Sequence, residues 1–94
     1  MGSARILIIE DDRSLAETMS ENIRKAGYEV TLAHDGLEGL SRVKLTTPDL
    51  VISNVTTPVI DGMDVCRRLR ADALTKDVLI LLLTAKAAEL EELV

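Results

Sequence analysis

Three consecutive carboxylates, Glu10, Asp11 and Asp12, form the most prominent group of chemically active side chains in the sequence. Buried together they would repel one another, so they require a nearby cation or a solvent-facing loop. Mg²⁺ is a natural partner, because it binds oxygen ligands and keeps several waters, so that one or two carboxylates suffice. The alternative is structural: Asp12 caps a helix while Glu10 and Asp11 are solvated. The spacing alone leaves both interpretations open.

The residues before and after this acidic cluster predict the elements that position it. Arg5–Ile9 is a short, continuous run rich in Ile, which is typical of a strand buried on both faces of a parallel sheet. Apolar runs and helical patterns then alternate, which predicts an α/β fold built as an open, doubly wound parallel sheet. Further strands are expected over 30–33, 50–53 and 78–83, and helices over 14–26, 35–43, 63–70 and from 87 onward, the last one incomplete.

The helix starts and the core-facing side chains follow from capping and spacing patterns. Ser14 and Glu17 stand in capping-box register, so the first helix is expected to begin at Ser14. Asp35 and Glu38 repeat this spacing before the second helix, which its two glycines weaken. Strand 30–33 alternates apolar and polar residues and is expected at a sheet edge. The side chains expected to face the core from the first and third helices are Leu15, Met19, Ile23, Met63, Cys66 and Leu69.

The fold places a candidate site directly after the strands. In an open parallel sheet, ligands bind outside the carboxyl ends of the strands. The residues found there are the acidic cluster, Asn54 and Thr84. Three further polar residues nearby are interpreted differently: His34 as a surface residue, and Asp49 and Asp61, beside a proline and a glycine, as structural residues of turns.

Composition limits the classes of function. The net charge of −5 and the pI near 4.7 argue against a nucleic-acid surface, and Arg67, Arg68 and Arg70 are interpreted as a solvated helix face. A lone cysteine, Cys66, favours a reducing cytoplasm. The longest apolar run, 78–83, is too short to cross a membrane. We expect one domain over 4–94, with 1–3 as an expression scar or a disordered N-terminus.

Three motifs in the expected order resemble the receiver domain of two-component response regulators. They are the acidic pair after the first strand, Pro-Asp-Leu-Val-Ile-Ser-Asn-Val-Thr-Thr-Pro-Val-Ile-Asp-Gly around the third, and Leu-Leu-Thr-Ala-Lys after the fourth. The resemblance runs from Ala4 to the end of the chain and implies a flavodoxin-like fold without enzymatic activity of its own. It also implies a Mg²⁺ site in which Asp11 binds the ion directly, Glu10 acts through water and the Thr56 carbonyl completes the protein ligands.

The same resemblance gives roles to the residues after the fourth strand. Thr84 would contact a phosphoryl oxygen, although an ordinary strand-end threonine is the alternative. Ala85 is expected to be small so that it leaves room for the phosphoryl group. Lys86 lies where the family varies and is expected to tune hydrolysis.

Two departures from the family pattern bear on function. Where the family has an aspartate that attacks the phosphohistidine of a kinase, this chain has Asn54, whose amide has no anionic oxygen nucleophile and no charge to help hold Mg²⁺. We therefore expect phosphotransfer to fail and Mg²⁺ binding to be weak. The family's fifth strand, with its Lys-Pro motif, and its last helix have no counterpart before Val94, so strand 78–83 is expected to be an exposed edge through which copies associate.

Three functions remain to be separated. The first is a receiver made non-phosphorylatable by an Asp to Asn change, whose parent form is served by a histidine kinase or a phosphotransfer protein. The second is a pseudo-receiver, an interaction module that works without phosphate. Retention of Glu10, Asp11 and Thr84 favours the first. A flavodoxin-like cofactor enzyme ranks last, because Glu-Asp-Asp stands where a phosphate-cradling loop would be needed.

Overall fold

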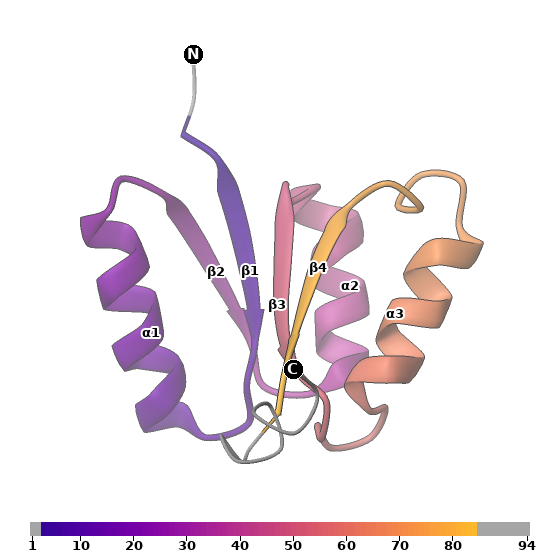
Figure 1. The fold of residues 1–94 in the computed structure, drawn as a ribbon, viewed down its shortest axis with the longest axis horizontal. Coiled ribbons are helices and arrows are strands. Elements are labelled where there is room, and N and C mark those ends of the chain that lie inside the picture. The colour runs from indigo at the N-terminus through magenta and orange to yellow at the C-terminus, as the bar shows by residue number, and fades with distance from the viewer. Residues whose placement is uncertain (1–2, 85–94) are drawn as a thin grey trace, which may run out of the picture.

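A computed structural model describes residues 3–84 as strands and helices in strict alternation (Figure 1). The strands are all parallel, in the order β2-β1-β3-β4. This arrangement confirms the predicted open, doubly wound α/β sheet, with strand 30–33 at one edge. The fourth helix expected from residue 87 lies outside the described residues. The elements are β1 (Arg5–Ile9), α1 (Arg13–Lys25), β2 (Glu29–Ala33), α2 (Gly36–Thr46), β3 (Leu50–Asn54), α3 (Gly62–Ala71) and β4 (Leu79–Leu83).

One face of the sheet, called the closed face below, is covered by α2 and α3 (Figure 1). Because successive side chains of a strand point to opposite faces, alternate residues of β1 and β3 meet these two helices. Together they form the main core, in which every member is at most 3% exposed. This core consists of Leu7, Ile9, Ala33, Val43, Val51, Val65 and Leu69.

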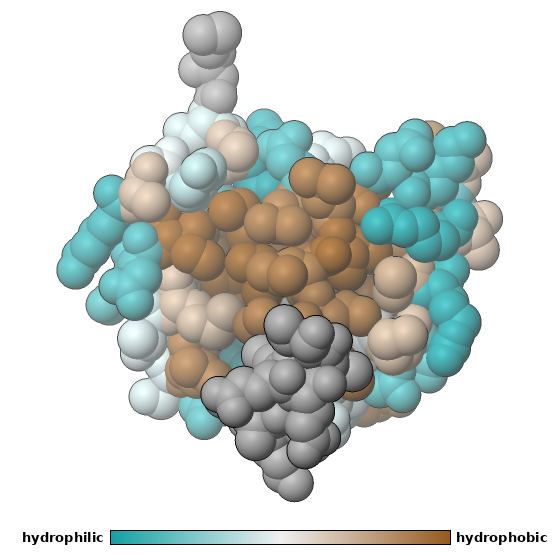
Figure 2. Space-filling view, viewed as in Figure 1, coloured by the Kyte–Doolittle hydropathy of each residue, from teal (hydrophilic) through white to brown (hydrophobic). Residues whose placement is uncertain are grey.

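Within residues 3–84 the other face, called the open face below, is covered by α1, which contacts β1 and β2. Ile8 is buried there, with Met19 and Ile23 of α1 packed against its cluster. Over β4 the cover is incomplete, since Leu79 is 67% and Leu81 49% exposed. Figure 2 shows the resulting apolar surface over the strands, between α1 and α3.

The N-cap predicted from the capping-box register is correct for α2 and wrong by two residues for α1. Asp12, not Ser14, is the N-cap of α1, and its carboxylate accepts a hydrogen bond from the Leu15 amide at 3.0 Å. The carboxylate is a strong capping group, which leaves Ser14 inside the first turn. At α2, the side chain of Asp35 accepts from the Glu38 amide at 2.8 Å, as the capping spacing predicts.

The core-facing residues of α1 and α3 were predicted only in part. In α1 the packed face contains Ala16 and Ser20, both buried, together with Met19 and Ile23, whereas Leu15 is 46% exposed. Small residues bring the helix close to the sheet, and they set the face that packs.

In α3 the buried residues are Gly62, Val65 and Leu69, which recur at i, i+3 and i+7. The predicted Met63 is 44% exposed, and Cys66 is only half-buried. The physical reason is again a close approach, because Gly62 packs against the backbone at the end of β3 and turns Val65 toward the sheet.

Candidate functional site

The carboxyl edge of the sheet brings the predicted site residues together. Ile9 of β1 is the Cα partner of Ser53 in β3, so Glu10 and Asn54 follow on neighbouring strands. Asn54 is in turn paired with Leu83, directly before Thr84, which is half-buried. The sequence therefore predicted the clustering of these residues correctly. Ala85 and Lys86 lie outside the described residues.

Glu10 is the buried centre of this cluster. Its side chain is only 4% exposed, which contradicts the interpretation of Glu10 as a solvated residue. The side-chain amide of Asn54 donates a hydrogen bond to Oε1, and the Asp12 backbone amide donates to Oε2 at 3.0 Å. A buried carboxylate needs such partners, because an unpaired buried charge is strongly destabilising.

The other two acidic residues behave as the structural interpretation predicted. Asp12 is exposed and caps α1, and Asp11 is exposed beside it. Thr56, whose carbonyl was expected among the metal ligands, is exposed in the loop after β3. Among residues 3–84 no group of three or more His, Cys, Asp or Glu side chains is placed to hold a metal ion.

Mg²⁺ fits this arrangement poorly. Asp11 and the Thr56 carbonyl are oxygen donors of the kind that Mg²⁺ binds. However, both oxygens of Glu10 accept hydrogen bonds from within the chain, and Asn54 contributes no charge. These hydrogen bonds reduce the negative potential that the Glu10 carboxylate offers to a cation, although each of its oxygens keeps a second lone pair.

The loop between β3 and α3 holds Asn54 in place. The Gly62 amide donates to the Val55 carbonyl at 2.7 Å. A Cβ atom on Gly62 would clash with the backbone carbonyl of Asn54, so only glycine allows α3 to begin this close to the strand. Asp61 caps α3, accepting from the Asp64 amide at 2.8 Å, which confirms its predicted structural role.

The same loop is fastened to α2 and held in an unusual backbone conformation. The Gly36 amide donates to the Pro58 carbonyl at 3.2 Å, and the buried Thr57 hydroxyl donates to the Ile60 carbonyl. Val59, 74% exposed, has a φ of 71°, which is rare for a β-branched residue. These hydrogen bonds keep the loop in a fixed shape beside the site.

Asp49, at the other end of β3, also has its predicted structural role. Its carboxylate accepts a hydrogen bond from the Arg5 amide at 2.7 Å, which joins the start of β1 to the turn before β3. It takes no part in the site at the carboxyl edge.

His34, which was predicted to be a surface residue, lies at the site. It is half-buried, and its Nδ1 lies 3.3 Å from the Glu10 backbone carbonyl. Its Nε2 lies 3.5 Å from a guanidinium nitrogen of Arg13, which can only donate. Because a backbone carbonyl only accepts, the contact with Glu10 is a hydrogen bond in the tautomer that carries the ring proton on Nδ1. The signal that could have identified His34 is its position directly after β2, next to β1 in the sheet.

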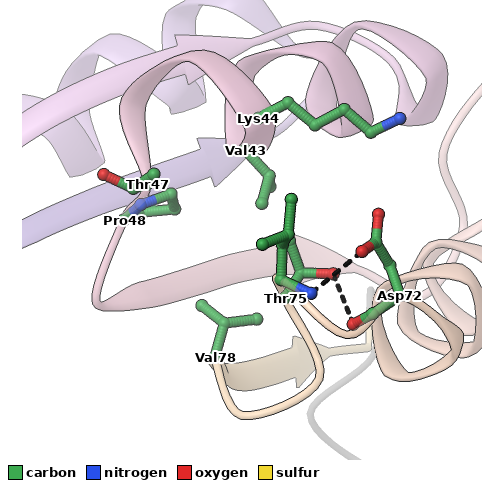
Figure 3. A pocket seen from close by; sticks show the side chains of 8 residues that line it. Val43, Lys44, Thr47, Pro48, Asp72, Thr75 and Val78 are labelled. Atoms are coloured by element: carbon green, nitrogen blue, oxygen red, sulfur yellow. Dashed lines mark hydrogen bonds between the residues drawn. The ribbon is translucent and has the colours of Figure 1, made fainter.

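A separate cavity of about 380 Å³ lies at the opposite, amino edge of the sheet, between the end of α2 and the loop after α3 (Figure 3). Its lining includes Val43, Pro48 and Val78, which are apolar. The Thr75 hydroxyl, also in the wall, donates to the Leu69 carbonyl at 2.7 Å and is satisfied within the chain. No residue of the candidate site lines this cavity.

None of the helices within residues 3–84 is long and apolar enough to cross a membrane.

The chain is 42% identical over 84 residues to the response regulator MprA of Mycobacterium tuberculosis, covering 89% of this chain and 36% of that protein. It is 43% identical over 81 residues to RpaA of Synechocystis, described as a DNA-binding dual master transcriptional regulator, covering 86% of this chain and 34% of that protein. The chain thus spans about a third of the length of these curated relatives.

Solved structures agree with the sequence relatives. The chemotaxis protein CheY4 of Vibrio cholerae superposes with a TM-score of 0.86 at 30% identity, covering 98% of this chain and 77% of CheY4. A response regulator from Chloroflexus aurantiacus superposes with a TM-score of 0.85 at 38% identity, covering 93% of this chain and 73% of that chain. Residues 6–93 match the family described as the response regulator receiver domain. With strand order, site position and relatives in agreement, this chain belongs to the response regulator receiver domain family.

Proposed function

We propose that this receiver domain takes no phosphoryl group at position 54 and acts in two-component signalling as a non-phosphorylatable form of its parent. The observation that carries the proposal is Asn54 itself, which ends β3 beside the buried Glu10, where the family has its acceptor aspartate. We further propose that it is a signalling module and not an enzyme, and that it works in the cytoplasm.

The chemistry of the acceptor explains why Asn54 is inactive. In a receiver with aspartate, a carboxylate oxygen forms a bond to phosphorus while the bond from phosphorus to the histidine nitrogen of the donor breaks. The nitrogen lone pair of an amide is delocalised, and its oxygen carries no negative charge, so Asn54 has no comparable nucleophile. Its Nδ2 is moreover directed at Glu10 by a hydrogen bond.

Intact-mass spectrometry after incubation with acetyl phosphate and Mg²⁺ tests this proposal. The chain should show no added phosphoryl mass. Asn54→Asp is the matched control, because an adduct on that variant alone would assign the inactivity to residue 54. A stable adduct on the unchanged chain would overturn the proposal.

The partners proposed for the parent form are a histidine kinase or a phosphotransfer protein, which would meet the carboxyl edge. Receiver domains generally bind Mg²⁺ at this acidic site. For this chain we propose weak binding through Asp11, the Thr56 carbonyl and Glu10. A titration of the Asp11→Asn variant should show reduced affinity, whereas unchanged binding would place the ion elsewhere.

A phosphate-independent pseudo-receiver is the second candidate, and one observation favours it. Both carboxylate oxygens of Glu10 accept a hydrogen bond from within the chain, without phosphate or metal. The two candidates differ in what an acceptor aspartate would do: Asn54→Asp should change partner binding in a former phosphate switch and leave it unchanged in a pseudo-receiver.

We also propose that copies of this chain associate through β4. Leu79 and Leu81 are exposed on the open face, and within the described residues β4 lies at the edge of the sheet. Pairing would bury this apolar surface and satisfy backbone groups of the edge strand. Sedimentation across a dilution series should show a dimer that Leu81→Lys dissociates, while Leu45→Lys, at an exposed leucine of α2, leaves it intact. A monomer at every concentration would contradict the proposal.

A further inference from the structure

Glu10 connects all the segments that meet at the carboxyl edge of β1. Its amide donates to the Ala33 carbonyl at 2.9 Å, and its carbonyl lies 3.3 Å from Nδ1 of His34. Its carboxylate accepts from the Asp12 amide and from the Asn54 side chain. A single buried residue therefore joins β1 to β2, to the start of α1 and to β3. Within residues 3–84, Asn54 is the only side chain that donates a hydrogen bond to the Glu10 carboxylate.

The orientation of the Asn54 amide follows from chemistry. An ionised carboxylate only accepts hydrogen bonds, so the amide nitrogen, not its oxygen, must face Glu10. An ionised aspartate at position 54 would have no hydrogen to donate and would place a second negative charge against the buried one. The Asn54 amide thus stabilises the buried Glu10 carboxylate, which would otherwise need a cation or a proton.

We propose that Asn54 is a latch on Glu10: its amide competes for Oε1 with the water through which Glu10 would act on Mg²⁺, and it makes the carboxyl edge stable without metal. This inference rests on the proposed function and concerns the same site. It adds a second effect of Asn54, weaker Mg²⁺ binding, to the loss of the nucleophile. Charge loss alone predicts that alanine at position 54 binds Mg²⁺ no better than asparagine. The latch predicts the opposite, because alanine leaves Oε1 free.

Calorimetric titration with MgCl₂ at constant ionic strength separates the two accounts. The expected order of affinity is Asn54→Asp, then Asn54→Ala, then the unchanged chain. Asn54→Ala should bind about tenfold more tightly than the unchanged chain, as expected when a charge-assisted hydrogen bond no longer competes for Oε1. Mg²⁺ should raise the melting temperature of Asn54→Asp. The melting temperature of the unchanged chain should be the same in Mg²⁺ as in a matched concentration of monovalent salt.

NMR of the Asn54 side-chain amide keeps the proposal testable if Asn54→Ala fails to fold. Glu10→Gln should shift this amide resonance, while the matched change Glu21→Gln, at an exposed glutamate of α1, should not. Equal Mg²⁺ affinity of the alanine variant and the unchanged chain would overturn the latch. So would an Asn54 amide resonance that does not shift in Glu10→Gln. A phosphoryl adduct on Asn54 would instead contradict the proposed function and leave the latch standing, so the two failures are distinguishable.

Discussion

Aliphatic side chains line both faces of this sheet, but helices cover the two faces to different extents. On the closed face, α2 and α3 bury the members of the core to 3% exposure or less. On the open face, α1 covers β1 and β2, and Leu79 and Leu81 remain about half exposed or more. Strand composition therefore does not determine how deeply a side chain is buried. The helices that reach a face determine it, since burial is what stabilises an apolar side chain.

The largest expected effect compares one leucine from each face. Leu69→Ala on the closed face should lower the free energy of unfolding by about 2–5 kcal/mol, because Leu69 is 3% exposed and its removal leaves a cavity. Leu79→Ala on the open face should cost less than about 1 kcal/mol. Urea unfolding followed by circular dichroism, at concentrations where the chain is monomeric, measures both. Equal losses would show that the open face is covered in solution.

A smaller effect is expected where α3 approaches the closed face most tightly. Gly62→Ala should cost about 1–3 kcal/mol, because the added Cβ clashes with the backbone carbonyl of Asn54. Gly39→Ala is the comparison: its Cβ would clash with Cδ1 and Cγ1 of the buried Ile9 side chain, which can shift more readily than a backbone carbonyl, so the loss should be smaller. Thermal unfolding ranks the two, and a Gly39→Ala loss as large as that of Gly62→Ala would contradict this account.

The smallest effect concerns a polar group under α1. The Ser20 hydroxyl is buried and has no hydrogen-bond partner among the described residues. Ser20→Ala should therefore leave stability unchanged or raise it by up to about 1 kcal/mol. Ser53→Ala, which removes a hydroxyl that donates to the Asn54 carbonyl at 2.9 Å, should instead cost about 1 kcal/mol. A clear loss for Ser20→Ala in chemical denaturation would reveal a bound water that satisfies this hydroxyl.

Several features of the site were predictable because they depend on neighbouring residues in the chain. The run of apolar residues before Glu10 predicts a buried strand, and parallel strands bring their carboxyl ends to one edge. Glu10, Asn54 and Thr84 were therefore expected together, and they are together. The spacing of Asp35 and Glu38 likewise predicted the start of α2 from a single local hydrogen bond.

Other features of the site depend on contacts between distant segments, which local patterns do not encode. No local pattern within the acidic cluster predicts that Glu10 is buried and Asp11 exposed. In the structure Asn54 and Asp12 both donate to Glu10, which compensates its burial. His34 joined the site only because β2 pairs with β1.

The sequence by itself determined the order of the elements, the parallel sheet and the edge at which polar residues gather, because apolar periodicity and capping act over a few residues. Only the tertiary structure decided which side of each helix packs and which carboxylate is buried. Val65, not Met63, faces the core because Gly62 lets α3 start against the backbone of β3. Such close approaches depend on residues far apart in the chain, and their energies are settled only when the segments meet.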